Sequence, residues 1–230
     1  MSELLLEEHK FNQITDDEIK DIIRKCKRKN IELEILEEVE RLYKINKNDY
    51  YDFRDGNFCL ESELLDFDTA KKLITWISGK KNHHVCWYKF ELLFNMKHDG
   101  LKSETFHKNC DGKGPTIVII KLFNNNLIGG YNPLDWECRN VFKKTKDSFL
   151  FQKYKCLNGY IHKKSNIIPG YENKAIACSP SNCSMFGITN LYIQSGSKHC
   201  NLISSNYESL NMSGDYLIKS YEVLRVIKQK

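Results

Sequence analysis

The sequence lacks any long hydrophobic run. No window comes near the roughly 20 consecutive apolar residues that a helix needs to cross a bilayer. The opening segment MSELLLEEHK holds only three consecutive leucines between acidic residues, whereas a secretory signal has a basic start and a longer apolar stretch. We therefore expect a cytoplasmic protein without a transmembrane segment.

The cysteines also lack the close pairs from which zinc sites are usually built. A structural zinc site takes four ligands from short paired spacings, and C-x-x-C is the strong form of this signal. The nearest groups in this chain are Cys178–Cys183 with the pair His199–Cys200, and separately the segment His83–Cys86. Both spacings are loose, so we expect no metal site.

The chain shows no convincing nucleophile. Nine cysteines, an odd number, in a chain without an export signal indicate free thiols, most of them buried as small apolar side chains. Cys110 beside His107 is the best candidate by sequence distance. It stands at the C-terminal end of an expected helix, where the helix dipole disfavours a thiolate. We interpret it as a packing cysteine and expect no catalytic residue.

Motifs for nucleotides and nucleic acids are missing as well. The segment Asp111–Thr116, DGKGPT, lacks the order G-x-x-x-x-G-K-[ST] and precedes a strand pattern, which is typical of a helix-to-strand turn. The basic run Arg24–Lys29 has no interleaved aromatic residues and leads into a glutamate-rich stretch, as a solvated helix face does. We expect no cofactor and no nucleic-acid partner.

What the sequence does contain suffices for one large domain, or one ordinary domain with a short appendage. Of its 230 residues 41% are hydrophobic and 28% charged, which indicates a folded, soluble chain, and its net charge is +5. Near the N-terminus, Thr15–Glu18 is a capping box, and apolar spacing predicts helices on both sides of residue 30. Residues 46–57 are polar and turn-rich. We place a helical segment with its linker at 1–56 and the main domain at 57–230.

The remainder of the chain is rich in strand patterns. Helices are predicted at 67–78 and at 103–110, the second capped by Ser103. Predicted strands cover 90–94, 116–123, 127–131, 148–154, 174–178, 190–194 and 216–227. Long helices are missing between these strands, so parallel crossovers are not expected and the pairing should be antiparallel. The fold class is α+β, a two-sheet antiparallel β-sandwich with flanking helices.

Several segments together resemble a known family. They are FELLFNMKHDG at 90–100, LIGGYNPLDWE at 127–137, KTKDSFLFQ at 144–152, ITNLYIQSGSKHC at 188–200 and SYEVLRV at 220–226. In this order they resemble the TLDc domain of the oxidation-resistance proteins, and the likeness runs from about Ser62 to Lys230. The chain departs from the family pattern in two places. Of the family's glycine cluster before the Leu-Tyr strand it keeps only Gly187, and Leu224 replaces an aromatic residue.

The resemblance marks fourteen candidate positions, structural or partner-binding. They are Asp99, Gly100, Gly129, Gly130, Tyr131, Trp136, Asp147, Phe149, Phe151, Gly187, Leu191, Tyr192, Cys200 and Glu222.

The resemblance also implies a function. Members of the family have a β-sandwich with flanking helices and no established catalytic centre, and they are linked to oxidative-stress resistance and to binding and regulation of the vacuolar proton ATPase. This chain is therefore expected to be a non-enzymatic binding module with a protein partner. Two alternatives stay open: a thiol-based antioxidant or zinc-dependent enzyme, and a helical adaptor that self-associates through residues 14–45.

Overall fold

The computed structural model of the chain describes residues 58–79, 87–157 and 159–229. All of them belong to one compact unit that spans Tyr50–Lys230. The expected N-terminal helices, the linker at 46–57 and the segment His83–Cys86 lie outside the described residues.

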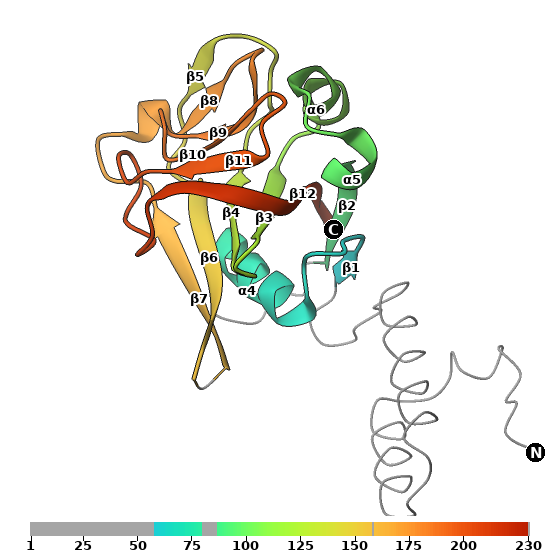
Figure 1. Cartoon of the computed structure of the whole chain (residues 1–230), viewed down its shortest axis with the longest axis vertical. Coiled ribbons are helices and arrows are strands. Elements are labelled where there is room, and N and C mark those ends of the chain that lie inside the picture. Colours follow the sequence, from blue (N-terminus) through green and yellow to red (C-terminus); the bar gives the residue numbers. More distant parts are fainter. Residues whose placement is uncertain (1–57, 80–86, 158, 230) are drawn as a thin grey trace, which may run out of the picture. The chain divides into compact units, whose positions relative to one another are not determined.

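The described elements are mostly strands (Figure 1). The helices are α4 (Phe67–Ser78), α5 (Met96–Asp99), α6 (Ser103–Cys110) and the 3-10 turn η1 (Glu172–Lys174). The strands are β1 (Phe58–Leu60), β2 (Trp87–Asn95), β3 (Thr116–Leu122), β4 (Leu127–Asn132), β5 (Val141–Lys143), β6 (Phe149–Cys156), β7 (Gly159–Asn166), β8 (Ile176–Cys178), β9 (Asn182–Phe186), β10 (Leu191–Gln194), β11 (His199–Leu202) and β12 (Gly214–Gln229). None of the helices in these ranges is long and apolar enough to span a membrane.

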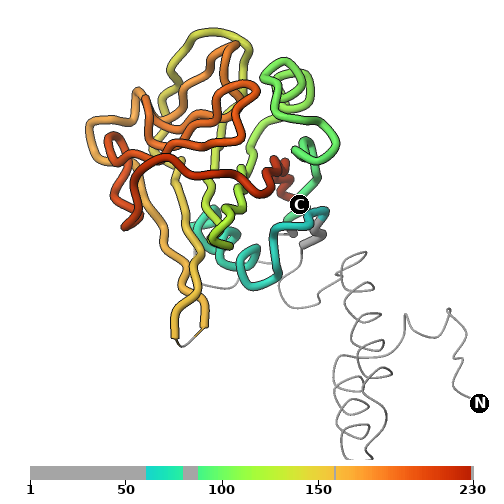
Figure 2. Tube along the Cα trace, in the orientation of Figure 1, coloured from blue at the N-terminus to red at the C-terminus, as the bar shows by residue number. Residues whose placement is uncertain are grey.

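The 16-residue strand β12 connects the two portions of the sheet. The strand order is β5-β8-β9-β10-β11-β12-β3-β4-β6-β7, and β2 pairs with the C-terminal part of β12. The start of β12 pairs with β11, and its middle pairs with β3. The tube in Figure 2 follows this strand from one portion to the other. One long strand therefore belongs to both portions.

The expected antiparallel pairing is confirmed for the predicted strands at 116–123, 127–131, 148–154 and 216–227. The expectation was wrong for one pair, because β1 and β2 run parallel. The 12-residue helix α4 lies between them in the sequence. This helix provides the crossover that a parallel pair needs.

Two apolar cores lie on opposite faces of β3. Val118 and Ile120 point into a core shared with β8–β11 and α6, whereas Ile117 and Ile119 point into a second core covered by α4. The nearly continuous apolar run of this strand indicated burial on both faces, and the structure confirms it. From α4, Leu73 is buried in the second core.

Local signals explain the ends of the helices. The Asp66 carboxylate accepts from the Thr69 amide at the start of α4, and Gly79 closes that helix with a φ of 65°. The prediction for α6 was wrong in one detail. Lys102 stands at its N-cap without a side-chain hydrogen bond, and the Ser103 amide donates instead to Ser195 Oγ at 2.9 Å.

Candidate functional site

Glu222, a candidate position on β12, joins segments from both ends of the domain. Its carboxylate accepts from Ser62 Oγ at 2.5 Å, from the Glu63 amide at 3.2 Å and from Asn95 Nδ2 at 3.2 Å. The side chain is buried, and burial raises the pKa of Glu222. Three donors on one buried carboxylate make this position a structural connection between the start of the domain, β2 and β12.

Gly129 and Gly130 on β4 are required by close packing. A Cβ on Gly129 would lie 2.0 Å from the carbonyl oxygen of Val118, and a Cβ on Gly130 would lie 2.6 Å from the ring of Phe186. The β3–β4 register runs through both glycines without a shift, so close approach rather than a bulge explains them. Their neighbours belong to the same chain.

Trp136 anchors the loop after β4 in the first core. Its indole Nε1 donates to Thr116 Oγ1 at 2.8 Å, and its ring makes edge-on contacts with Phe106 and Phe186. The ring is 1% exposed. A buried indole with its N–H paired serves packing.

The Gly187 loop is built on two buried asparagines. Gly187 has a φ of 65°, and a Cβ there would lie 2.2 Å from Asn190 Oδ1. Asn190 Nδ2 donates to the carbonyl oxygen of Ile203, while Asn206 Oδ1 accepts from the Ile188 amide. Side-chain amides of Asn190 and Asn206 therefore fix this loop.

The other candidate positions divide between core and surface. Tyr131, Phe149, Phe151, Leu191 and Cys200 are buried. Gly100 has a φ of 74°, and Asp99 Oδ2 beside it accepts from the Asn95 amide at 2.8 Å. Tyr192 is half-buried and Asp147 is exposed. The structure thus brings most of these positions into the scaffold rather than onto one common surface.

The cysteines whose side chains the structure describes are free, and four of them are buried: Cys110, Cys178, Cys183 and Cys200. Burial raises the pKa of all four thiols, to about 12 for Cys183 and Cys200. Within the described ranges no group of three or more His, Cys, Asp or Glu side chains is placed to hold a metal ion. His199 pairs instead with Asp215 at 2.7 Å.

His107 does not act as a base toward Cys110 in this arrangement. Its Nδ1 lies 2.8 Å from Asp111 Oδ1 and its Nε2 lies 3.0 Å from the carbonyl oxygen of Ser179, so both ring nitrogens are engaged. The turn that follows α6 also uses its own amides. Gly114 N donates to Asp135 Oδ1 at 2.6 Å, which leaves this amide unavailable to a phosphate.

The hairpin of β6 and β7 projects from the remainder of the described domain (Figure 1). It carries exposed apolar side chains at Leu157, Tyr160 and Ile161, and Tyr160 is 60% exposed. Sequence reasoning missed β7. The dipeptide Asn158–Gly159, a strong hairpin signal between two strand patterns, could have found it.

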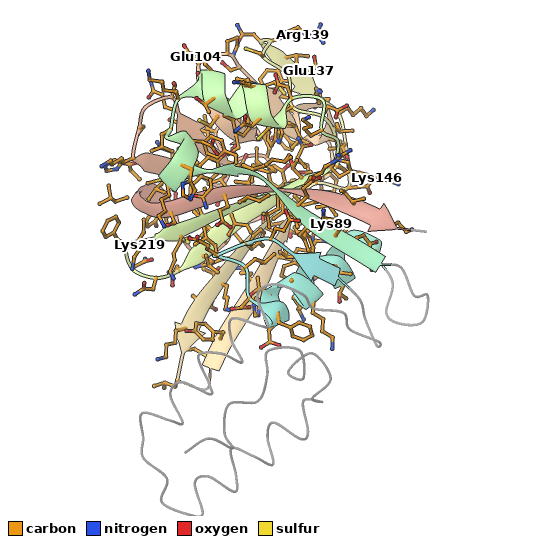
Figure 3. All side chains as sticks on the ribbon, turned by 90° about the vertical axis from the view of Figure 1, so that its right-hand side faces the viewer. Lys89, Glu104, Glu137, Arg139, Lys146 and Lys219 are labelled. Atoms are coloured by element: carbon orange, nitrogen blue, oxygen red, sulfur yellow. The ribbon has the colours of Figure 1, made fainter. Side chains whose placement is uncertain are left out.

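The hairpin and the residues around it are also basic. Residues 139–174 hold nine lysines and arginines against two acidic residues. Before β6, Arg139 and Lys143 both pair with Glu137 and lower its pKa, and Figure 3 shows Glu137 and Arg139 at the end of the domain that also bears Glu104. β6 and β7 carry four of these lysines and no acidic residue, although Lys153 pairs with Asp66 from outside the hairpin.

Polar contacts tie the hairpin to the start of α4. His162 Nε2 lies 3.0 Å from Thr69 Oγ1, which donates to Asp66 Oδ1 at 2.6 Å, and Lys153 pairs with the other Asp66 oxygen. Burial, and next the positive charge of Lys153, lower the pKa of His162 below its ordinary 6.5. The neutral ring is therefore favoured in the folded protein.

This histidine predicts a pH dependence. Because the folded protein binds the proton more weakly than the unfolded chain, stability is lost as the pH falls below about 6.5. A His162→Gln protein keeps a donor for Thr69 without a titrating ring. Urea unfolding at pH 7 and pH 5 should show a larger loss on acidification for wild type than for His162→Gln. Equal losses in the two proteins would contradict this assignment.

The fold and these contacts define a mostly antiparallel β domain in which Gly129, Gly130 and Gly187 are required by close packing. A family model described as the TLDc domain matches residues 58–226. The chain belongs to the TLDc domain family. It is also similar to the MTOR-associated protein MEAK7 of Gallus gallus, with 30% identity over 103 residues. This match covers 44% of the chain and only 21% of that relative.

Proposed function

We propose that this chain is a non-enzymatic TLDc module that binds a protein partner in the cytoplasm, with its TLDc domain at 57–230 after an N-terminal helical segment at 1–56. The match of the family model to residues 58–226 carries the proposal. The vacuolar proton ATPase is the partner that family membership suggests, and oxidative-stress resistance is the cellular role.

The chemistry of the described side chains supports binding over thiol catalysis. A reactive cysteine needs a lowered pKa and access to solvent. The thiols of Cys110, Cys183 and Cys200 have the opposite properties, because they are buried and burial raises their pKa. A surface contact is therefore the mechanism that these residues favour.

The relative supports a role in protein association within narrow limits. MEAK7 is named as MTOR-associated, but the matching segment covers about a fifth of its length. The partner of the whole relative is therefore not transferred to this chain.

Affinity capture tests the proposed partner. The tagged full-length chain, incubated with detergent-solubilised membranes from its own cells, should retain subunits of the vacuolar proton ATPase. The control is an equally tagged chain with Gly129→Ala, whose fold we expect to be strongly destabilised. Equal recovery of ATPase subunits with both baits would contradict specific binding.

The thiol alternative makes a separate prediction. Serine replacements of Cys138, which is exposed, and Cys156, which is half-buried, should leave ATPase capture and survival under peroxide within about twofold of wild type, because no thiolate takes part. Survival assays with each single variant check this. Loss of protection in either variant, with normal thermal melting, would replace the binding proposal by thiol chemistry.

A further inference from the structure

Among the described residues, the chain covers the outer edge of β7 only at the C-terminal end of this strand. The Asn166 amide donates to Glu208 Oε2 at 3.0 Å, and the Glu208 amide donates back to the Asn166 carbonyl oxygen at 3.0 Å. Ile167 then forms a bridge with Tyr207. The backbone groups of Asn166 therefore point away from β6, toward the outer side of the sheet.

The same side of β7 stays open further toward the hairpin tip. Alternate residues of an antiparallel strand turn their backbone N–H and C=O groups to the same side. The backbone groups of Tyr160, His162 and Lys164 therefore point outward, as those of Asn166 do. Among the residues that the structure describes, none bonds to these outward backbone groups. A row of unpaired groups on an edge strand is a template for a further strand.

The positive charge beside this edge determines which kind of partner can bind there. Lys163 and Lys164 are consecutive on β7, and Lys155 stands opposite Tyr160 on β6. A second copy paired through the same edge would place these basic residues against one another, which is unfavourable. A lipid surface would leave the outward amides without partners in an apolar medium. An acidic polypeptide satisfies both the charges and the backbone.

We propose that the outer edge of β7, from Tyr160 to Lys164, binds an extended acidic segment of a partner protein as an added strand. This inference rests on the proposed role of the chain as a protein-binding module and names the surface and the chemistry of its partner. Main-chain hydrogen bonds provide the affinity in such an arrangement, and the alternating side chains provide the selectivity. Exposed Tyr160 and Ile161 offer apolar contacts between the charges.

A labelled seven-residue peptide of alternating glutamate and valine, capped at both ends, is the probe. Fluorescence anisotropy with the full-length chain should show binding that weakens as salt is raised, and a lysine–valine peptide should bind at least tenfold more weakly. Tyr160→Pro removes both the tyrosine ring and one outward backbone N–H. Tyr160→Ala removes the ring but keeps that N–H. We expect at least tenfold weaker binding for Tyr160→Pro and less than threefold for Tyr160→Ala.

If Tyr160→Pro folds poorly, hydrogen exchange of the wild-type chain still tests the proposal. In the wild-type chain, the acidic peptide should slow exchange at the amides of Tyr160, His162 and Lys164. Equal binding by the two Tyr160 variants, unchanged exchange at these amides, or binding to phosphatidylserine vesicles without peptide binding would overturn the inference. If the chain captures the ATPase but does not bind the peptide, the inference about this edge is wrong and the proposed function stands. If the chain binds the peptide but does not capture the ATPase, the proposed ATPase partner is wrong and the inference about this edge stands.

Discussion

A Gly129→Ala protein is expected to lose about 3 kcal/mol or more of its unfolding free energy, at or beyond the upper end of typical overpacking costs. The added Cβ would lie 2.0 Å from the carbonyl oxygen of Val118, and this oxygen belongs to the backbone of the central strand β3. Backbone in the middle of a sheet cannot move aside without breaking its ladder. Urea unfolding followed by circular dichroism measures the loss.

Gly130→Ala is the matched control for this prediction. Its Cβ would meet Phe186 and Leu150, in both cases at side-chain atoms, with the shortest approach at 2.6 Å. Side chains can shift where backbone cannot, so the loss should be smaller, about 1–3 kcal/mol. Equal and small losses in the two variants would show that this packing is looser than the structure indicates.

Glu222→Ala is expected to cost about 3 kcal/mol, because donors that lose a buried charged acceptor pay a desolvation penalty of that order. Ser62 Oγ, the Glu63 amide and Asn95 Nδ2 would all lose their shared acceptor. Glu222→Gln keeps one carbonyl oxygen and should cost less. Thermal and urea unfolding of the three proteins provide the comparison, and wild-type stability for Glu222→Ala would remove Glu222 from the structural role assigned here.

The pH profile gives an independent check on Glu222. Its pKa is raised by burial above the ordinary 4.5, so the folded protein holds this proton more tightly than the unfolded chain. Stability from this group is therefore present below about pH 4.5 and is lost as the pH rises through the folded value. The loss of unfolding free energy caused by Glu222→Gln should accordingly become smaller as the pH rises from 4.5 to 7.

Strands with long apolar runs could be predicted from the sequence. β3 has such a run, and β12 carries apolar residues interspersed along its 16 residues, so the positions of both could be predicted. β1, β5, β7, β9 and β11 were missed. β5 and β11 have three and four residues, and β7 carries lysines and a histidine as an edge strand does. Edge and short strands lack the periodicity on which such predictions depend.

The roles of the candidate positions were less accessible to sequence reasoning. Glu222 meets Ser62 across 160 residues of sequence, and Gly130 meets Phe186 on a strand far from it along the chain. No local sequence pattern indicates such contacts. Family resemblance identified these positions, and the structure explains them as packing and buried hydrogen bonding.

The most direct measurement of the central claim is the rate of proton pumping by isolated membranes that carry the vacuolar ATPase. Purified full-length chain should change the rate in proportion to its occupancy, and the chain in which both Cys138 and Cys156 are serine should act equally. Membranes from cells without the ATPase should bind neither protein. If pumping is unaffected at every concentration of the wild-type chain, or if only the chain with Cys138 and Cys156 intact acts, the account of a non-enzymatic module that regulates this ATPase is contradicted.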